Sequence, residues 1–109
     1  MSQNQQANQL TQKVQQMAQQ LQQKQDEMTR LNQKLEENTQ VLKIIETLPK
    51  ERKCHRLVGG ILVEMQNEKV QSELASESEE LKKMVGFSME NLIKHQKEFD
   101  VLRNQLTAQ

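Results

Sequence analysis

The chain has 109 residues, enough for one domain, yet its composition argues against a compact globular core. Hydrophobic residues make up 34% and aromatic residues 2%, whereas charged residues reach 28%. Because aromatic side chains supply much of the buried area of a core, this mixture favours long helices or a coiled coil. With 15 basic and 15 acidic residues the net charge is zero, so no overall field attracts nucleic acid or acidic lipid.

The cysteine count and the hydropathy pattern point to a cellular compartment. The single cysteine, Cys54, excludes an internal disulfide and is compatible with a reducing environment. No apolar run approaches the roughly 20 residues that span a bilayer. The amino terminus also lacks the basic and then hydrophobic segments of a signal peptide. We therefore expect a cytoplasmic protein that has no membrane partner.

The first half of the chain predicts one long helix over about residues 8–48. Its apolar residues recur in alternating steps of four and three, which is the seam of a coiled coil. Pro49 ends this pattern, because it lacks an N–H group and restricts the residue before it. Two polar residues interrupt the seam, and we interpret Asn38 as one that sets the helix register. The seam positions are Leu10, Val14, Met17, Leu21, Lys24, Met28, Leu31, Leu35, Asn38, Leu42 and Ile45.

Residues 52–66 predict a β-hairpin, because apolar and β-branched residues alternate on both sides of Gly59 and Gly60. A Gly-Gly pair suits a type I′ turn, in which both central residues need positive φ. Pairing outward from the turn places two apolar residues, Leu57 and Leu62, on one face together with His55 and Glu64. The opposite face carries Cys54, Val58, Ile61, Val63 and Met65, with Arg56 as the one charged exception.

A second, weaker seam predicts a helix over about residues 70–107. Gly86 lies inside it and costs about 1 kcal/mol relative to Ala. If the chain folds back at the glycine pair, Lys24 faces His95 and Met17 faces Leu102. The seam positions are Leu74, Ser78, Leu81, Val85, Ser88, Leu92, His95, Phe99, Leu102 and Leu106.

The predicted fold class is mainly α, an antiparallel two-helix coiled coil joined by one β-hairpin in a single domain, residues 1–109. Two strands alone are marginal in water, and their outer edges present unpaired N–H and C=O groups. The helices are expected to use their apolar seams on each other, which leaves the hairpin uncovered. We therefore predict that the hairpin completes a sheet made with other chains.

The hairpin residues resemble those of the β class of prefoldin subunits. The resemblance extends over about residues 8–108, and His55 departs from it, because an aromatic residue is expected there. The residues that carry it are Arg52, Lys53, Cys54, Arg56, Gly59, Gly60, Leu62, Val63 and Glu64.

This resemblance implies a hetero-hexamer of α-class and β-class prefoldin subunits. The hairpins would close into an intermolecular β-barrel, from which the coiled coils project. The free ends of the coiled coils would hold unfolded client proteins, typically actin and tubulin, and pass them to the cytosolic group II chaperonin.

Two sets of candidate functional residues follow. We expect the hairpin residues to mediate subunit assembly, namely Cys54, Arg56, Leu57, Val58, Gly59, Gly60, Ile61, Leu62, Val63 and Met65. In an antiparallel hairpin the termini lie far from the turn, and the first 25 residues contain 12 Gln and only two charged side chains. Seam residues near such an end fray and offer adaptable apolar contacts. The predicted client-binding tip is Leu10, Val14, Met17, Phe99, Leu102 and Leu106, and the alternative is that these residues simply close the coiled coil.

Other chemistry finds little support in the sequence. Cys54 and His55 point to opposite faces of a strand, and two histidines with one cysteine are too few for a structural zinc site. No phosphate-loop motif accompanies the glycine pair. We expect no metal, no cofactor, no nucleic-acid partner and no catalytic residue. A basic cluster, Lys50, Arg52, Lys53 and Arg56, is expected to be solvated or paired with Glu46, Glu51 and Glu64; contact with an acidic partner chaperone is the alternative.

The resemblance implies a co-chaperone that acts as a holdase, and the missing phosphate-loop and catalytic motifs predict that it is ATP-independent and not an enzyme. The alternative is a structural coiled-coil adaptor or tether that recognises one specific folded partner.

Overall fold

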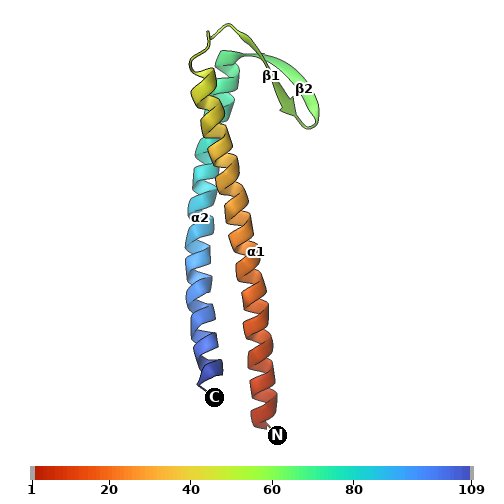
Figure 1. Cartoon of the computed structure of the whole chain (residues 1–109), viewed down its shortest axis with the longest axis vertical. Helices are drawn as coiled ribbons and strands as arrows, with labels where there is room; N and C mark the ends of the chain where they lie inside the picture. The colour runs from red at the N-terminus through yellow and green to blue at the C-terminus, as the bar shows by residue number, and fades with distance from the viewer. Residues whose placement is uncertain (1, 109) are drawn as a thin grey trace. The chain divides into compact units, whose positions relative to one another are not determined.

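The computed structural model describes residues 2–108 and contains two long helices with an antiparallel two-stranded hairpin between them (Figure 1). Helix α1 spans Ser2–Ile45, strand β1 Lys53–Val58, strand β2 Ile61–Gln66 and helix α2 Asn67–Thr107. The predicted fold class is confirmed. The helix bounds differ from the expected ones, since α1 starts before residue 8 and α2 starts before residue 70.

The chain divides into two compact units, and each contains a segment of both helices. The hairpin unit is Leu31–Met84, and the terminal unit combines Met1–Arg30 with Val85–Gln109. In both units every predicted seam position is buried or half-buried, whereas most positions between them are exposed. Leu21 is buried in the terminal unit, and Ile45, Val70, Leu74 and Leu81 are buried in the hairpin unit.

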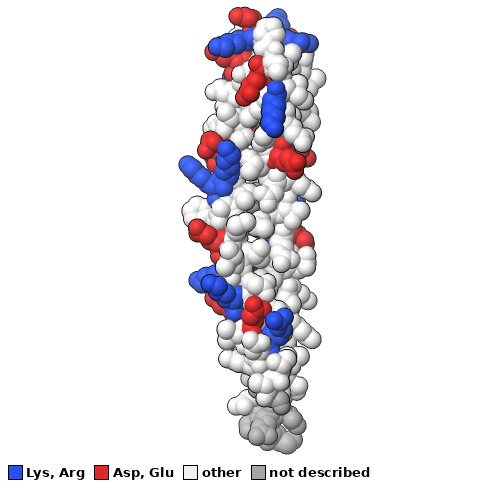
Figure 2. Space-filling view, turned by 60° about the vertical axis from the view of Figure 1, so that its left-hand side comes forward, with Lys and Arg blue, Asp and Glu red and all other residues white. Residues whose placement is uncertain are grey.

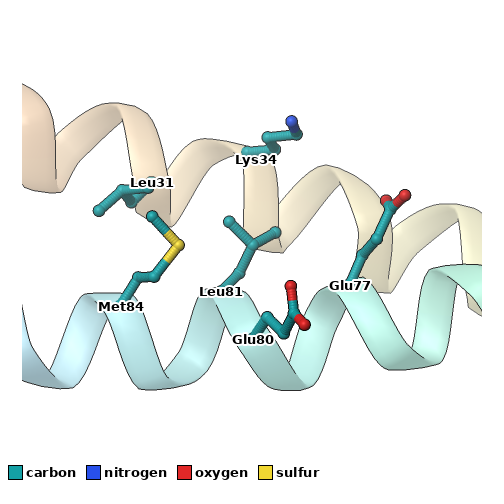
Figure 3. A pocket seen from close by; sticks show the side chains of 6 residues that line it. All are labelled: Leu31, Lys34, Glu77, Glu80, Leu81 and Met84. Atoms are coloured by element: carbon teal, nitrogen blue, oxygen red, sulfur yellow. The ribbon is translucent and has the colours of Figure 1, made fainter. Parts of the chain in front are cut away.

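The two helices pair about one helical turn away from the predicted register. In the hairpin unit, Leu31 lines a groove together with Leu81 and Met84, whose side chains point towards α1 (Figure 3). In the terminal unit, Lys24 Nζ donates a hydrogen bond to Asn91 Oδ1 at 2.8 Å, one turn before the predicted partner His95.

Unequal connections explain this shift. Residues 46–52 separate α1 from β1, whereas β2 ends at Gln66 and α2 begins at the next residue. The centre of the hairpin is therefore not the centre of the helix pair. A register deduced by folding the chain at the glycine pair places α2 too far along α1.

Asn67 ties the end of α1 to the start of α2. Its side chain is fully buried, and Nδ2 lies 2.8, 3.2 and 3.1 Å from the carbonyl oxygens of Ile45, Leu48 and Pro49. Gln71 Nε2 also donates to the Ile45 carbonyl at 3.0 Å. The last carbonyls of a helix have no partner within the helix, so these side chains supply the missing donors.

The backbone of the same junction fixes the entry to the hairpin. The N–H of Asn67 donates to the Arg52 carbonyl at 2.8 Å, and the N–H of Glu68 donates to the Lys50 carbonyl at 3.1 Å. The first N–H groups of a helix also lack internal partners. The free N–H groups at the start of α2 are therefore paired with carbonyls of the segment that leads into β1. These bonds attach the base of the hairpin to α2, and the Asn67 side chain attaches it to α1.

We predict that Asn67→Ala lowers the free energy of unfolding by about 1–3 kcal/mol, because it removes a fully buried amide that bonds to three carbonyls and leaves the Leu48 carbonyl without a donor among the described residues. Ala is the better helix former, so helix propensity cannot account for the loss. Urea unfolding followed by circular dichroism measures the effect. Gln66→Ala, at the exposed neighbouring residue, is the control and should change the value by less than about 0.5 kcal/mol. Equal unfolding midpoints for the two variants would contradict this role of Asn67.

Candidate functional site

The hairpin has the register and the turn that the sequence predicts. Val58 pairs with Ile61, and the pairing continues outward through Leu57 with Leu62 to Lys53 with Gln66. The φ angles of Gly59 and Gly60 are 56° and 82°, as both central positions of a type I′ turn require. The alternation of side chains therefore assigns each hairpin residue to one of two faces.

The inner face of the hairpin lies against the helices near its base. Cys54 and Met65 pack on a buried cluster formed by Ile45, Val70 and Leu74. The expectation that the helices leave the hairpin wholly uncovered is therefore wrong for this face. At this end of the helix pair the apolar core therefore contains side chains from the strands as well as from both helices.

Arg56 makes a second attachment further along the inner face. Its Nη1 lies 2.8 Å from Glu73 Oε2, and its Nη2 lies 2.5 Å from Glu77 Oε1. The Arg56 side chain keeps only 22% of its exposure, so both contacts are partly shielded from solvent. We call these three residues the Arg56 clamp.

The two glutamates raise the pKa of Arg56 above its usual value. The hydrogen bond that Arg56 donates to Glu77 is the main cause, and burial partly opposes it. The hydrogen bond donated to Glu73 and the negative charges of both carboxylates add to the rise. A raised pKa favours the charged guanidinium, and the associated stability is lost only as the pH rises through that pKa. Arg56 therefore stays charged across the working pH range.

The outer face and the tip of the hairpin are exposed. Leu57 and Leu62 of the outer face are 70% and 64% exposed, and Val58 and Ile61 at the tip are 46% and 68% exposed. Within residues 2–108 the sheet has only these two strands, so both outer edges carry backbone groups without a strand partner. Exposed apolar side chains beside open edges form a surface suited to pairing with other strands.

The predicted assembly residues thus divide into two groups with different surroundings. Cys54, Arg56, Val63 and Met65 are half-buried on the inner face. The exposed group consists of Leu57, Val58, Gly59, Gly60, Ile61 and Leu62.

The basic cluster is mostly exposed to solvent, which was one of the two expectations, and its one ion-paired member has partners other than the expected ones. Of its four members, only Arg56 forms an ion pair with a described residue, and the carboxylates are those of Glu73 and Glu77. The expected partners Glu46, Glu51 and Glu64 are all exposed. Lys50, Arg52 and Lys53 are exposed at the entrance of the hairpin.

The terminal unit contains a groove between its two helix segments. Leu10 and Leu102 are half-buried in it, and exposed Gln6, Gln9 and Gln105 line it together with Lys13. On the face shown in Figure 2, the surface next to the grey residues carries no charged side chains. The groove therefore combines apolar contacts with neutral amides and one cation.

All residues of the predicted client-binding tip lie in the terminal unit and are half-buried. Phe99 is also covered by the guanidinium of Arg103, which lies 5.6 Å from the centre of its ring. This set comprises Leu10, Val14, Met17, Phe99, Leu102 and Leu106.

Among residues 2–108, no three His, Cys, Asp or Glu side chains gather closely enough to hold a metal ion. None of the helices in the described part of the chain has an apolar stretch long enough to cross a membrane.

Sequence reasoning missed the glutamates of the Arg56 clamp and the role of Asn67. Glu73 and Glu77 are four residues apart and so share one helix face, and Arg56 is the only charge on the inner face of the hairpin. These two features together are a signal for the clamp. Nothing in the sequence around Asn67 indicates that its side chain reaches across to α1.

Comparison with known proteins agrees with this architecture. The family model described as "Prefoldin subunit" matches residues 3–109. Among solved structures, the prefoldin beta subunit from Thermococcus strain KS-1 matches with a TM-score of 0.81 and 22% sequence identity, over 94% of this chain and 90% of that chain. At this identity the structural match shows the fold alone. The comparison with curated protein sequences found no match.

Proposed function

Since the chain belongs to the prefoldin subunit family, a family of chaperone subunits, we propose that it forms a hetero-hexamer with other α-class and β-class subunits. We take it to be a single prefoldin-like domain of the β class. Within that class the hairpin sequence most resembles the subunit 2 type, and we assign the chain to this type. Its proposed location is the cytoplasm.

The exposed half of the hairpin is the observation that carries this proposal. Leu57 and Leu62 remain more than half exposed in the single chain, and the strand edges beside them have no partner among the described residues. Two strands are marginally stable alone, so added strands from neighbouring subunits would cover the apolar side chains and satisfy the edges. An intermolecular β-barrel achieves both at once, because a closed barrel has no edge.

The terminal groove supports the second part of the proposal, which is that the chain holds unfolded proteins. Half-buried Leu10 and Leu102 offer apolar contacts, and the neighbouring glutamines offer neutral donors and acceptors. Unfolded clients expose both apolar side chains and backbone amides, so such a groove accepts many sequences without a fixed shape.

Holding of this kind needs no nucleotide, and the chain contains no phosphate-loop motif. We therefore propose an ATP-independent co-chaperone without catalytic residues. Unfolded actin and tubulin chains are the proposed clients, and the cytosolic group II chaperonin is the proposed recipient.

We predict that Leu62→Glu prevents assembly with partner prefoldin subunits, because the variant places a charge at the centre of the new interface. Native mass spectrometry and sedimentation should show a loss of hexamer affinity of at least about 30-fold. Phe87→Glu is the matched control, since Phe87 is 74% exposed on α2 and lies outside the hairpin. Circular dichroism should show the same helix content for both variants. Hexamer formation by Leu62→Glu at the wild-type level would contradict the proposal.

We predict separately that the double variant Leu10→Ser, Leu102→Ser assembles normally but suppresses aggregation several-fold less well. The assay uses several unrelated, chemically denatured proteins without nucleotide. Leu31→Ser with Leu35→Ser is the control, because it also replaces two half-buried seam leucines, but in the hairpin unit.

The outcome also separates the holdase from an adaptor. If wild-type hexamer fails to suppress aggregation but binds one native protein tightly, the chain is an adaptor. If both double variants lose activity equally, the terminal groove is not the client site.

A further inference from the structure

The hairpin is attached to its own helices at two places along one face. At its base, Cys54 and Met65 pack on the buried cluster of Ile45, Val70 and Leu74. Further along β1, Arg56 bonds to Glu73 and Glu77 of α2. Beyond Arg56, the tip residues Val58 and Ile61 are exposed.

Two attachments restrict a hairpin in a way that one cannot. A strand pair attached to a helix only at its base would be free to rotate about that base. Arg56 lies two residues from Cys54, on the same face and nearer the tip. A line through both attachments therefore fixes the angle between the hairpin and α2.

The guanidinium suits this task because it joins two carboxylates at once. Nη1 and Nη2 each donate to a different glutamate, and the two glutamates lie one helical turn apart along α2. The planar group therefore holds the strand in one orientation relative to the helix axis. A lysine would supply one mobile charge and no such plane.

The energetic contribution of the clamp to folding is modest. The glutamate side chains retain 35% and 42% of their exposure, and solvent screens pairs of this kind. Burial at the base of the hairpin contributes most of the attachment energy. The main effect of the clamp is therefore on the direction of the hairpin relative to α2, and not on the free energy of unfolding.

We propose that the Arg56 clamp fixes the direction in which the hairpin leaves α2, and so presents Leu57, Leu62 and the open strand edges ready for pairing with neighbouring subunits. This inference rests on the proposed function, because it concerns the same assembly surface. A hairpin that is already oriented loses less conformational freedom when it pairs, and productive encounters are more frequent. Arg56 is in this sense a positioning residue.

The first test measures the hairpin direction in the isolated chain. Spin labels at Ile61→Cys and Lys83→Cys, in a Cys54→Ser background, report the distance from the tip of the hairpin to α2 within the hairpin unit. The clamp predicts one narrow distance distribution. Arg56→Gln and the double variant Glu73→Gln, Glu77→Gln should each broaden it, and Arg56→Lys should fall between these and the wild type. Lys69→Gln, which removes an exposed cation from the same unit, is the control.

The second test measures association with partner subunits by stopped-flow fluorescence. Arg56→Gln and the double glutamate variant should associate about threefold to tenfold more slowly than the wild type, while Lys69→Gln should not differ. Circular dichroism confirms that every variant is folded.

Unchanged distance distributions or unchanged association rates would overturn the inference. If the wild type itself does not assemble, the proposed function fails instead. The distance measurement then still decides whether the clamp directs the hairpin.

Discussion

The main physical constraint is a two-stranded sheet whose outer edges have no strand partner within residues 2–108. Strands β1 and β2 bury one face at the base, where Cys54 and Met65 reach the core. Leu57, Leu62 and the outer edges remain open. Strands added from other chains, as we propose, would cover the exposed apolar surface and pair the free backbone groups together. Membership of the prefoldin subunit family places the chain among proteins that are chaperone subunits, and the open hairpin gives a physical reason for assembly.

Other contacts in the hairpin unit tie the two strands to the helices. Asn67 links the end of α1 to the start of α2 through three carbonyls, and the backbone around it fixes the first residues of β1. The Arg56 clamp then adds a contact nearer the tip. Each of these contacts is polar and directional, whereas the apolar cluster supplies most of the burial. Apolar packing thus attaches the hairpin to the helices, and the hydrogen bonds set its orientation relative to them.

The sequence predicted the local features correctly and missed most of the contacts between distant segments. Every seam position that heptad spacing predicts is buried or half-buried, although buried Val70 lies outside the predicted seam. The glycine pair predicts the turn and the strand register correctly. Both patterns depend on near neighbours. The predicted pairing of the two helices differs from the observed pairing by about one helical turn. The pairing depends on the unequal connections on either side of the hairpin, which heptad spacing does not reveal. Asn38 is predicted to set the helix register, and its Nδ2 is buried without a hydrogen-bond partner among the described residues. The same is true of Ser78 Oγ, another polar position of the seam. The long-range bonds of Asn67 leave no pattern in the sequence, whereas the four-residue spacing of Glu73 and Glu77 is a signal for the bonds of Arg56.

Hydrogen exchange of the hairpin amides tests the central claim most directly. The outward-facing N–H groups of β1 and β2 should exchange rapidly in a dilute, isolated chain, because no strand covers them, and slowly in the assembled complex. The amides that pair β1 with β2 serve as the internal reference. Equal and strong protection of the outward amides in the isolated chain and in the complex would contradict the account, because it would mean that the sheet is complete without neighbours.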